Sequence, residues 1–359
     1  SLAGYDTTFG KRDFRPVTEE QGQMQSAAQN IGEEMHGVMS ELYPICRSIT
    51  GDGVRKTLES LGRIAPMTIH EVASGTECFD WVVPDEWNIR DACIADESGH
   101  RIIDFQKSNL HVVGYSEPVD TTLTMEELRP HLHTRPDLPD AIPYVTSYYQ
   151  RRWGFCLSEN QLSEMSGGPF HVFIDATLAP GSLSYGEIVL PGRSEKEILL
   201  SSYVCHPSMA NNELSGPVLT AFLAKHLMQM ENRTYTYRIV FVPETIGALC
   251  YLSRNLPILR ERCVGGYVLT CVGGPDDFTY LTTPDGDRLI DRTTIHTHCN
   301  RRSSELSRVD LDIRTRNSIM DGTRVVYQRC IVGSNQSKGL TSCGCVCIRS
   351  HDVRSDRIG

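Results

Sequence analysis

Hydrophobic residues recur at spacings of three and four in the first part of the chain, which is the period of an amphipathic helix. This pattern predicts one helix over residues 25–45 and a second over 54–61, with Gly62 at its end. Between them, residues 47–53 form a polar break that contains two glycines. The break either connects the two helices or binds an anion at the N-terminus of the second, and we favour the plain connector.

The period changes near residue 67, where hydrophobic and polar residues begin to alternate. Short runs typical of strands, separated by turn residues, occur at 67–72, 79–83, 90–94, 101–105 and 111–115. Within this region only residues 125–132 have a helical pattern. We therefore predict a small β-rich domain, residues 71–165, inserted into a chain that is α/β on either side.

Longer elements return after the insert. Residues 170–175 and 186–190 alternate and flank a Pro/Gly turn, which predicts two antiparallel strands of a larger sheet. Three strands of the buried type follow, at 198–204, 238–242 and 266–272. Because helical patterns follow the first two, we predict an α/β fold, a mainly parallel sheet with helices on both faces.

These patterns predict the domain organisation of the whole chain. A polar leader takes residues 1–23, the main domain takes 24–70 and 166–313, and the insert separates its two parts. Residues 287–297 are expected to add a helix, and 314–359 form an atypical tail rich in Arg, Ser, Gly and Cys. Cys343, Cys345 and Cys347 alternate there, which places them on one face of a strand and is not the spacing of a zinc knuckle.

Composition and charge narrow the class of protein. Of 359 residues, 40% are hydrophobic and 22% are charged, as in an ordinary globular protein. A formal net charge of −10 gives no attraction for nucleic acid or for an anionic membrane, and no hydrophobic run reaches transmembrane length. The thirteen cysteines are odd in number and scattered, and no signal-peptide core is present, so we expect reduced thiols and a cytoplasmic location.

Candidate chemistry follows the strand at 198–204. His206 and Glu213 occupy the polar turn between this strand and a helix for which Ser215 is the expected N-cap. Ligands of open α/β sheets bind at the carboxyl ends of the strands, so both side chains stand where chemistry is expected. Taken alone, a histidine in such a turn more often makes a hydrogen bond than binds a metal. The corresponding non-functional interpretation of Glu213 is an exposed turn residue.

Other residues nearby admit two interpretations each. The Cys205 side chain points away from His206 if the strand continues, so we expect core packing rather than a nucleophilic thiol. Glu244 follows a strand and precedes a helix, where it either caps the helix or acts as a base. Asp276 and Asp277, beyond the next strand, are loop acids or replacement carboxylates.

Three motifs in this order resemble the zinc aminopeptidase superfamily with co-catalytic metals. They are His206 with Asn212-Glu213-Leu214-Ser215-Gly216, then Glu244-Thr245-Ile246-Gly247, then Leu269-Thr270-Cys271-Val272-Gly273. The sequence is more similar to an uncharacterised bacterial branch of that superfamily, associated with polysaccharide-biosynthesis genes and carrying an inserted β-rich domain. Stretches at 79–90 and 147–155 carry this second resemblance, which covers about residues 25–300.

The resemblance also implies a changed metal site. Asn212, Thr245 and Thr270 stand where the superfamily has acidic metal ligands, so a two-metal site is not expected. One zinc ion is implied instead, held by His206, Glu213 and a further ligand from near the C-terminus. Relatives supply that ligand from a late histidine segment, which this chain lacks; beyond residue 298 its one histidine, at position 351, has a different context.

Two functions follow from the resemblance. In the first, the chain is a zinc-dependent hydrolase that cleaves an amide or peptide bond in a small peptide-like, N-acyl or aminoacyl substrate. Glu244 would be the general base, and Asn212, Thr245 and Thr270 would contact the substrate beneath the β-rich domain. In the second, the fold is kept as a binding or scaffold protein in polysaccharide biosynthesis and catalysis is lost.

Overall fold

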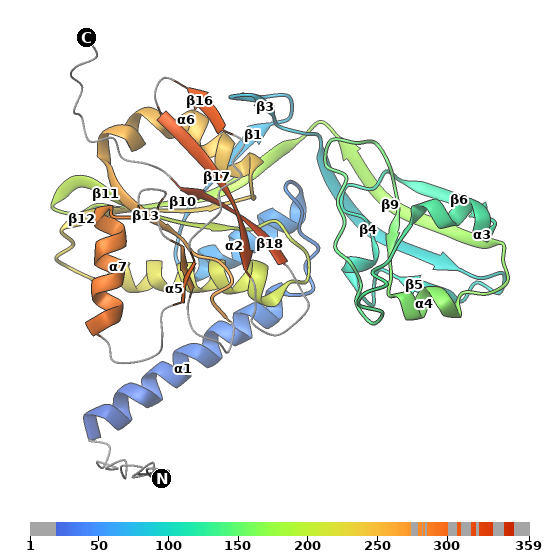
Figure 1. Ribbon diagram of the computed structural model, residues 1–359, viewed down its shortest axis with the longest axis horizontal. Coiled ribbons are helices and arrows are strands. Elements are labelled where there is room, and N and C mark those ends of the chain that lie inside the picture. The colour runs from blue at the N-terminus through green and yellow to red at the C-terminus, as the bar shows by residue number, and fades with distance from the viewer. Residues whose placement is uncertain are drawn as a thin grey trace, which may run out of the picture.

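The fold is given by a computed structural model (Figure 1). The structure describes the backbone over residues 19–273, 279–281, 283, 286–300, 307–309, 317–320, 323–332 and 341–347, and the side chains over 30–273, 280–281, 283 and 286–297. Asp276, Asp277 and His351 lie outside the described residues, as does most of the predicted leader.

A five-stranded sheet forms the main domain. Its strand order is β1 (Thr68–Ala73), β10 (Ser182–Leu190), β12 (Tyr235–Val242), β11 (Ser194–Tyr203) and β13 (Cys263–Val268). β11 runs parallel to β12 and β13, whereas β10 runs antiparallel to β1 and β12. The sheet is therefore mixed, in partial agreement with the prediction: four of its five strands run in the same direction and β10 runs against them. Parallel pairing occurs only between strands joined through crossover helices, because β1 and β10 lie on either side of the insert and are not linked by a helix.

Helices cover both faces of this sheet, as predicted. α1 (Glu19–Leu42), α2 (Asp52–Ile64) and α5 (Ser215–Gln229) share one hydrophobic core with the sheet. On the opposite face, α6 (Ile246–Arg262) packs against the alternate side chains of the same strands. α7 (Leu289–Asn300) lies beside β13 and confirms the helix predicted near residues 287–297.

A second, antiparallel sheet lies to one side of the main domain (Figure 1). Its order is β5 (Arg101–Asp104), β4 (Glu86–Ala95), β9 (Phe170–Ala179) and β6 (Val119–Leu123). β9 was predicted to enter the larger sheet, and that prediction was wrong. An alternating pattern shows that a segment is a strand but not which sheet it joins, and β9 runs almost directly into β10 of the main sheet. The limits of the inserted domain stay a prediction.

Short elements complete the described chain. They are β2 (Glu77–Cys78), β3 (Trp81–Val82), η1 (Asn109–His111), α3 (Met125–Leu128), η2 (Arg129–His131), β7 (Leu132–His133), β8 (Phe155–Cys156), α4 (Glu159–Glu164), η3 (Ala210–Leu214), β14 (Thr279–Leu281), β15 (Ser307–Val309), β16 (Asn317–Met320), β17 (Thr323–Val332) and β18 (Thr341–Cys347). β16, β17 and β18 pair in a three-stranded antiparallel sheet within the predicted tail. In the part of the chain described here, no helix combines the length and the apolar character needed to cross a membrane.

An arginine joins the insert to the main domain at the point where β4 begins. Arg55 on α2 contacts Glu86, the first residue of β4, at 2.6 Å, and Glu71 on β1 at 3.2 Å. Hydrogen bonds from Arg55 hold the pKa of Glu86 down at about 2, against the opposing effect of burial. This network fixes the beginning of β4 against α2.

Candidate metal centre

Three turns meet at one edge of the main sheet. β11, β12 and β13 are parallel, with Tyr203 paired to Val242 and Ser201 paired to Val268, so their carboxyl ends lie side by side. The turn after β11 carries His206, the turn after β12 carries Glu244, and the turn after β13 carries Thr270. Parallel strands therefore bring together the three motifs that the sequence analysis identified.

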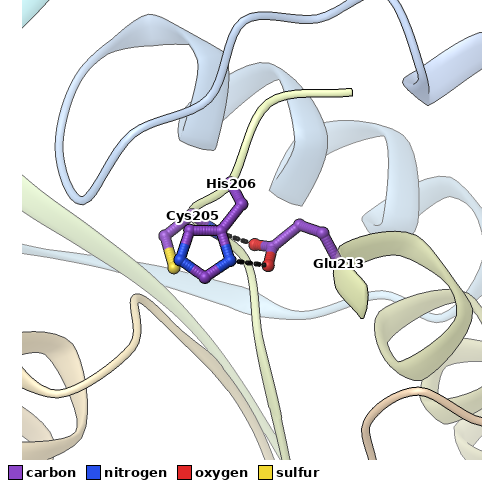
Figure 2. Close-up of side chains that lie close together, drawn as sticks. All are labelled: Cys205, His206 and Glu213. Atoms are coloured by element: carbon purple, nitrogen blue, oxygen red, sulfur yellow. Dashed lines mark hydrogen bonds and ion pairs between the residues drawn. The ribbon is translucent and has the colours of Figure 1, made fainter. Parts of the chain in front are cut away.

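Cys205, His206 and Glu213 form a compact cluster of possible metal ligands (Figure 2). The cysteine sulfur, an imidazole nitrogen and a carboxylate oxygen all lie within 4.8 Å of one another. Glu213 Oε2 is 2.9 Å from His206 Nδ1, and its other carboxylate oxygen accepts the backbone N–H of Cys205. Cys205 and Glu213 are fully buried and His206 is only 7% exposed, so the cluster is almost sealed from solvent.

Glu244 reaches the same imidazole from the neighbouring turn. Its Oε2 lies 3.0 Å from His206 Nε2, and its backbone N–H donates to the sulfur of Cys205 at 3.3 Å. The Glu244 side chain is 20% exposed, whereas that of Glu213 is buried. His206 therefore lies between a sealed carboxylate and one that solvent can reach.

The electrostatics of the cluster follow from burial and from its negative charges. Burial raises the pKa of Cys205 to about 12, with Glu213 adding to the shift, so the thiol is protonated when no cation is bound. Burial alone would lower the pKa of His206, but its electrostatic interactions with Cys205 and with the carboxylate of Glu213 raise it well above its usual range. A thiol held protonated in this way is a poor nucleophile, which favours a ligand role for Cys205 over a nucleophilic one.

The predicted substrate residues lie around this cluster. Asn212 Oδ1 is 3.1 Å from His206 Nδ1. Thr270 donates to the hydroxyl of Tyr203 at 2.5 Å and to the carbonyl of Asn212 at 3.4 Å. Thr245 directly follows Glu244 and occupies the N-cap position of α6. Their contact with a substrate stays a prediction.

Aromatic rings from the insert and from β11 pack against His206. The Tyr144 ring packs edge-on against His206, with ring centroids 5.0 Å apart, and Tyr203 packs edge-on at 5.8 Å. The Tyr144 and Tyr148 hydroxyls lie 3.0 Å from each other. Tyr144 belongs to the segment between β7 and β8, so a residue outside the main sheet completes the surroundings of His206.

Strained backbone is concentrated in the same three turns. Of the five non-glycine residues with positive φ in the described chain, Ser208 (42°), Thr245 (60°) and Cys271 (53°) each lie in one of them. Such conformations cost on the order of 1–3 kcal/mol each and persist where the surroundings impose them, most often at functional sites. This clustering supports a functional role for this edge of the sheet.

Two expectations about the turn after β11 were wrong. Cys205 was expected to point away from His206, but its sulfur joins the cluster because β11 ends at Tyr203 and the alternation of a strand stops there. Ser215 was expected to cap α5, yet a π-helical turn, Ala210–Leu214, leads directly into that helix. The Ser215 hydroxyl instead accepts the backbone N–H of Val272 at 2.9 Å and ties α5 to the turn after β13.

The donor set fits a zinc ion. Thiolate, imidazole and carboxylate are the three ligand types that zinc takes in proteins, and four-coordinate sites with three protein ligands keep one position open. Glu213 Oε2 accepts no well-aligned hydrogen bond from any described residue, although it is fully buried. The sequence analysis did not include Cys205 among the candidate ligands; its position next to His206 was the signal that could have identified it.

The family of the chain follows from comparison with known proteins. Residues 36–316 match the family model of a domain of unknown function, DUF4910. The chain belongs to this family. A Clostridium acetobutylicum protein, provisionally named as a polysaccharide biosynthesis protein with an aminopeptidase-like domain, is 48% identical over 270 residues, or 75% of this chain. The chain spans 62% of the length of that curated relative, whose name confirms the aminopeptidase-like resemblance.

Solved structures give the same picture for the DUF4910 chain. The crystal structure of a provisionally named peptidase from Clostridium acetobutylicum matches with a TM-score of 0.77 and 45% identity, covering 82% of this chain and 69% of that one. A zinc aminopeptidase from Bacillus subtilis matches at a TM-score of 0.49 and 11% identity, covering 77% and 79%. The first of these matches shows that the mixed α/β fold is shared with the Clostridium acetobutylicum protein.

Proposed function

We propose that this protein is a zinc-dependent hydrolase that cleaves an amide or peptide bond. The observation that carries the proposal is the buried cluster of Cys205, His206 and Glu213, whose three donor atoms lie within 4.8 Å of one another. A bound cation would stabilise this cluster, since a buried carboxylate and a buried thiolate both need a positive partner.

The buried residues of the site and the partly exposed Glu244 would have different roles in the reaction. Cys205, His206 and Glu213 would hold the ion, which when bound would polarise a substrate carbonyl and lower the pKa of water. Glu244, next to them and partly exposed, would accept a proton from the attacking water and return it to the leaving nitrogen. Tyr144 and Tyr203, whose rings pack edge-on against His206, would exclude bulk water from the site.

The substrate class is proposed from the relatives and from the walls of the site. The aminopeptidase-like name of the Clostridium acetobutylicum protein supports an amide substrate such as a small peptide, an aminoacyl or an N-acyl compound. Its polysaccharide-biosynthesis name supports a role in the same kind of pathway. A reducing, cytoplasmic setting is also part of the proposal, because Cys205 must be a free thiol to bind a cation.

Metal content tests the proposal. Elemental analysis of the purified protein should find about one zinc ion per chain, as expected for a site with three protein ligands and one open position. His206→Ala and Glu213→Gln should each lose it. The matched control is His226→Ala, which removes an exposed histidine of α5 and should keep the zinc.

Either result is informative. Zinc that is present in the wild type and the control, and lost in both ligand variants, supports screening of aminoacyl and N-acyl amides. Absence of any bound metal from folded wild-type protein would contradict the hydrolase. The binding or scaffold function, for which the loss of the acidic ligands at Asn212, Thr245 and Thr270 argues, would then be favoured.

A further inference from the structure

The polar break between the first two helices is buried beside the metal centre. Arg47, Ser48, Ile49 and Thr50 are each at most 3% exposed, which is unusual for a simple connector. The first amide of α2, that of Asp52, donates to the side chain of Asn88 at 2.7 Å. A side chain of the insert therefore occupies the helix end where an anion was considered.

Arg47 joins the end of α1 to the turn that carries His206. Its Nε donates to the carbonyl oxygen of His206 at 3.0 Å, and its Nη1 donates to the carbonyl of Leu42, the last residue of α1, at 2.7 Å. A cation is favourable at a helix C-terminus, where the carbonyl groups have no partners within the helix. The Ser208 hydroxyl makes a second link, donating to the carbonyl of Tyr43 at 3.1 Å.

The third nitrogen of Arg47 is buried without an acceptor. Among the described residues, none accepts a hydrogen bond from Nη2, although the side chain is 1% exposed. Burial lowers the pKa of Arg47, and the nearby carboxylate of Glu213 opposes that shift. A buried charge with an unused donor is costly, so its retention calls for an explanation beyond packing.

We propose that Arg47 is a positioning residue of the metal centre: it holds the His206 turn and places a permanent positive charge beside Glu213 and Cys205. This inference rests on the proposed zinc function. Two of the three candidate ligands are anionic when a cation is bound, so a fixed guanidinium beside them limits their mutual repulsion. Groups that orient ligands in this way typically change metal affinity by about 10–100-fold when they are removed.

The chain offers a matched control in Arg233. Its Nη1 donates to the carbonyl groups of Leu227 and Met230 at the end of α5, at 2.8 and 2.7 Å, and its Nε donates to Pro191. Arg233 thus stabilises a helix end as Arg47 does, but none of these contacts involves the metal centre. Arg233→Met should reproduce the loss of helix stabilisation without the loss of positioning.

The experiment compares Arg47→Met, Arg47→Lys and Arg233→Met with the wild type. In metal-free protein, hydrogen–deuterium exchange of the backbone amides in the turn that carries His206 is followed by peptide mass spectrometry. In Arg47→Met these amides should exchange about tenfold faster or more, the effect of losing a hydrogen bond to a charged donor, and in Arg233→Met they should match the wild type. In a competition titration with zinc alone, Arg47→Met should bind about 10–100-fold more weakly than both.

Each outcome decides one question. Unchanged amide exchange of the His206 turn in Arg47→Met, or zinc affinity equal to that of Arg233→Met, overturns the role of Arg47. If the wild type binds no zinc, the proposed function fails, while amide exchange of the His206 turn still tests its positioning. Should Arg47→Met not fold, Arg47→Lys gives the comparison, because lysine keeps the charge but cannot span both carbonyl groups in the fixed geometry of a guanidinium.

Discussion

His206 Nε2 and Glu244 Oε2 lie 3.0 Å apart, although the two residues stand on turns that follow different strands. The other ring nitrogen, Nδ1, faces the carboxylate of Glu213 at 2.9 Å. One imidazole is thus held between two carboxylates, one buried and one partly open to solvent. This difference in exposure assigns Glu213 to ion binding and Glu244 to proton transfer in the proposed reaction.

Glu244→Gln should separate chemistry from binding. The amide keeps the shape of the side chain but does not accept a proton, so kcat should fall about 10²–10⁴-fold while zinc content stays unchanged. Hydrolysis of an aminoacyl and N-acyl amide panel, with zinc measured on the same samples, checks this. Loss of zinc from the variant would instead make Glu244 a ligand.

Cys205→Ser should weaken zinc binding, since a hydroxyl is a far poorer zinc ligand than a thiolate. The cobalt-substituted wild type should show a thiolate-to-cobalt charge-transfer band in the near ultraviolet, and the variant should lack it. Cys263→Ser, at another buried cysteine that starts β13, is the control and should retain the band. A band that persists in Cys205→Ser would remove Cys205 from the site.

Tyr144→Phe should slow turnover without loss of zinc. Burial raises the pKa of Tyr144 well above its usual value, so its hydroxyl stays neutral and is able to donate a hydrogen bond to a substrate oxygen. We expect kcat to fall by about 10²-fold, as for other single donors to a developing negative charge. Tyr149→Phe, whose exposed side chain donates to the carbonyl of Val82, should leave kcat unchanged.

Gly216→Ala should destabilise the fold at the site. A Cβ atom there would lie 2.3 Å from the carbonyl oxygen of Leu269 and 2.6 Å from the Ser202 hydroxyl, so α5 would have to shift away from β13. We expect a loss of about 1–3 kcal/mol in the free energy of unfolding, measured by urea denaturation. Gly62→Ala, in α2, meets nothing closer than 3.7 Å and should be neutral or slightly stabilising.

Acid should loosen the contact between Arg55 and the insert. The pKa of Glu86 falls from 4.5 to about 2 on folding, so its contribution is complete above pH 4.5 and is lost as the pH falls toward 2. After allowance for solvent screening we expect roughly 1–2 kcal/mol. Denaturant titrations at a series of pH values should show this loss in the wild type and a smaller one in Arg55→Met. Equal pH dependence in both proteins would contradict the assignment.

Local sequence determined much of the main domain and part of the site. The helices around α1 and α2, the β-rich character of the insert and the strand–turn–helix order all follow from short-range periodicity. His206 and Glu213 were identified as candidate ligands through the motif of the turn that they share, in which they stand seven positions apart. Glu244 was identified through its motif.

Only the tertiary structure decided which distant segments meet. Alternation shows that β9 is a strand, but hydrogen bonding to β4 and β6 places it in the second sheet. Tyr144 reaches His206 from the insert, and Arg47 reaches it from the end of α1, over 159 residues of sequence. No periodic pattern encodes such contacts, because they depend on how whole elements pack. The sequence therefore predicted the turn that carries His206, and only the tertiary structure identified the residues that surround it.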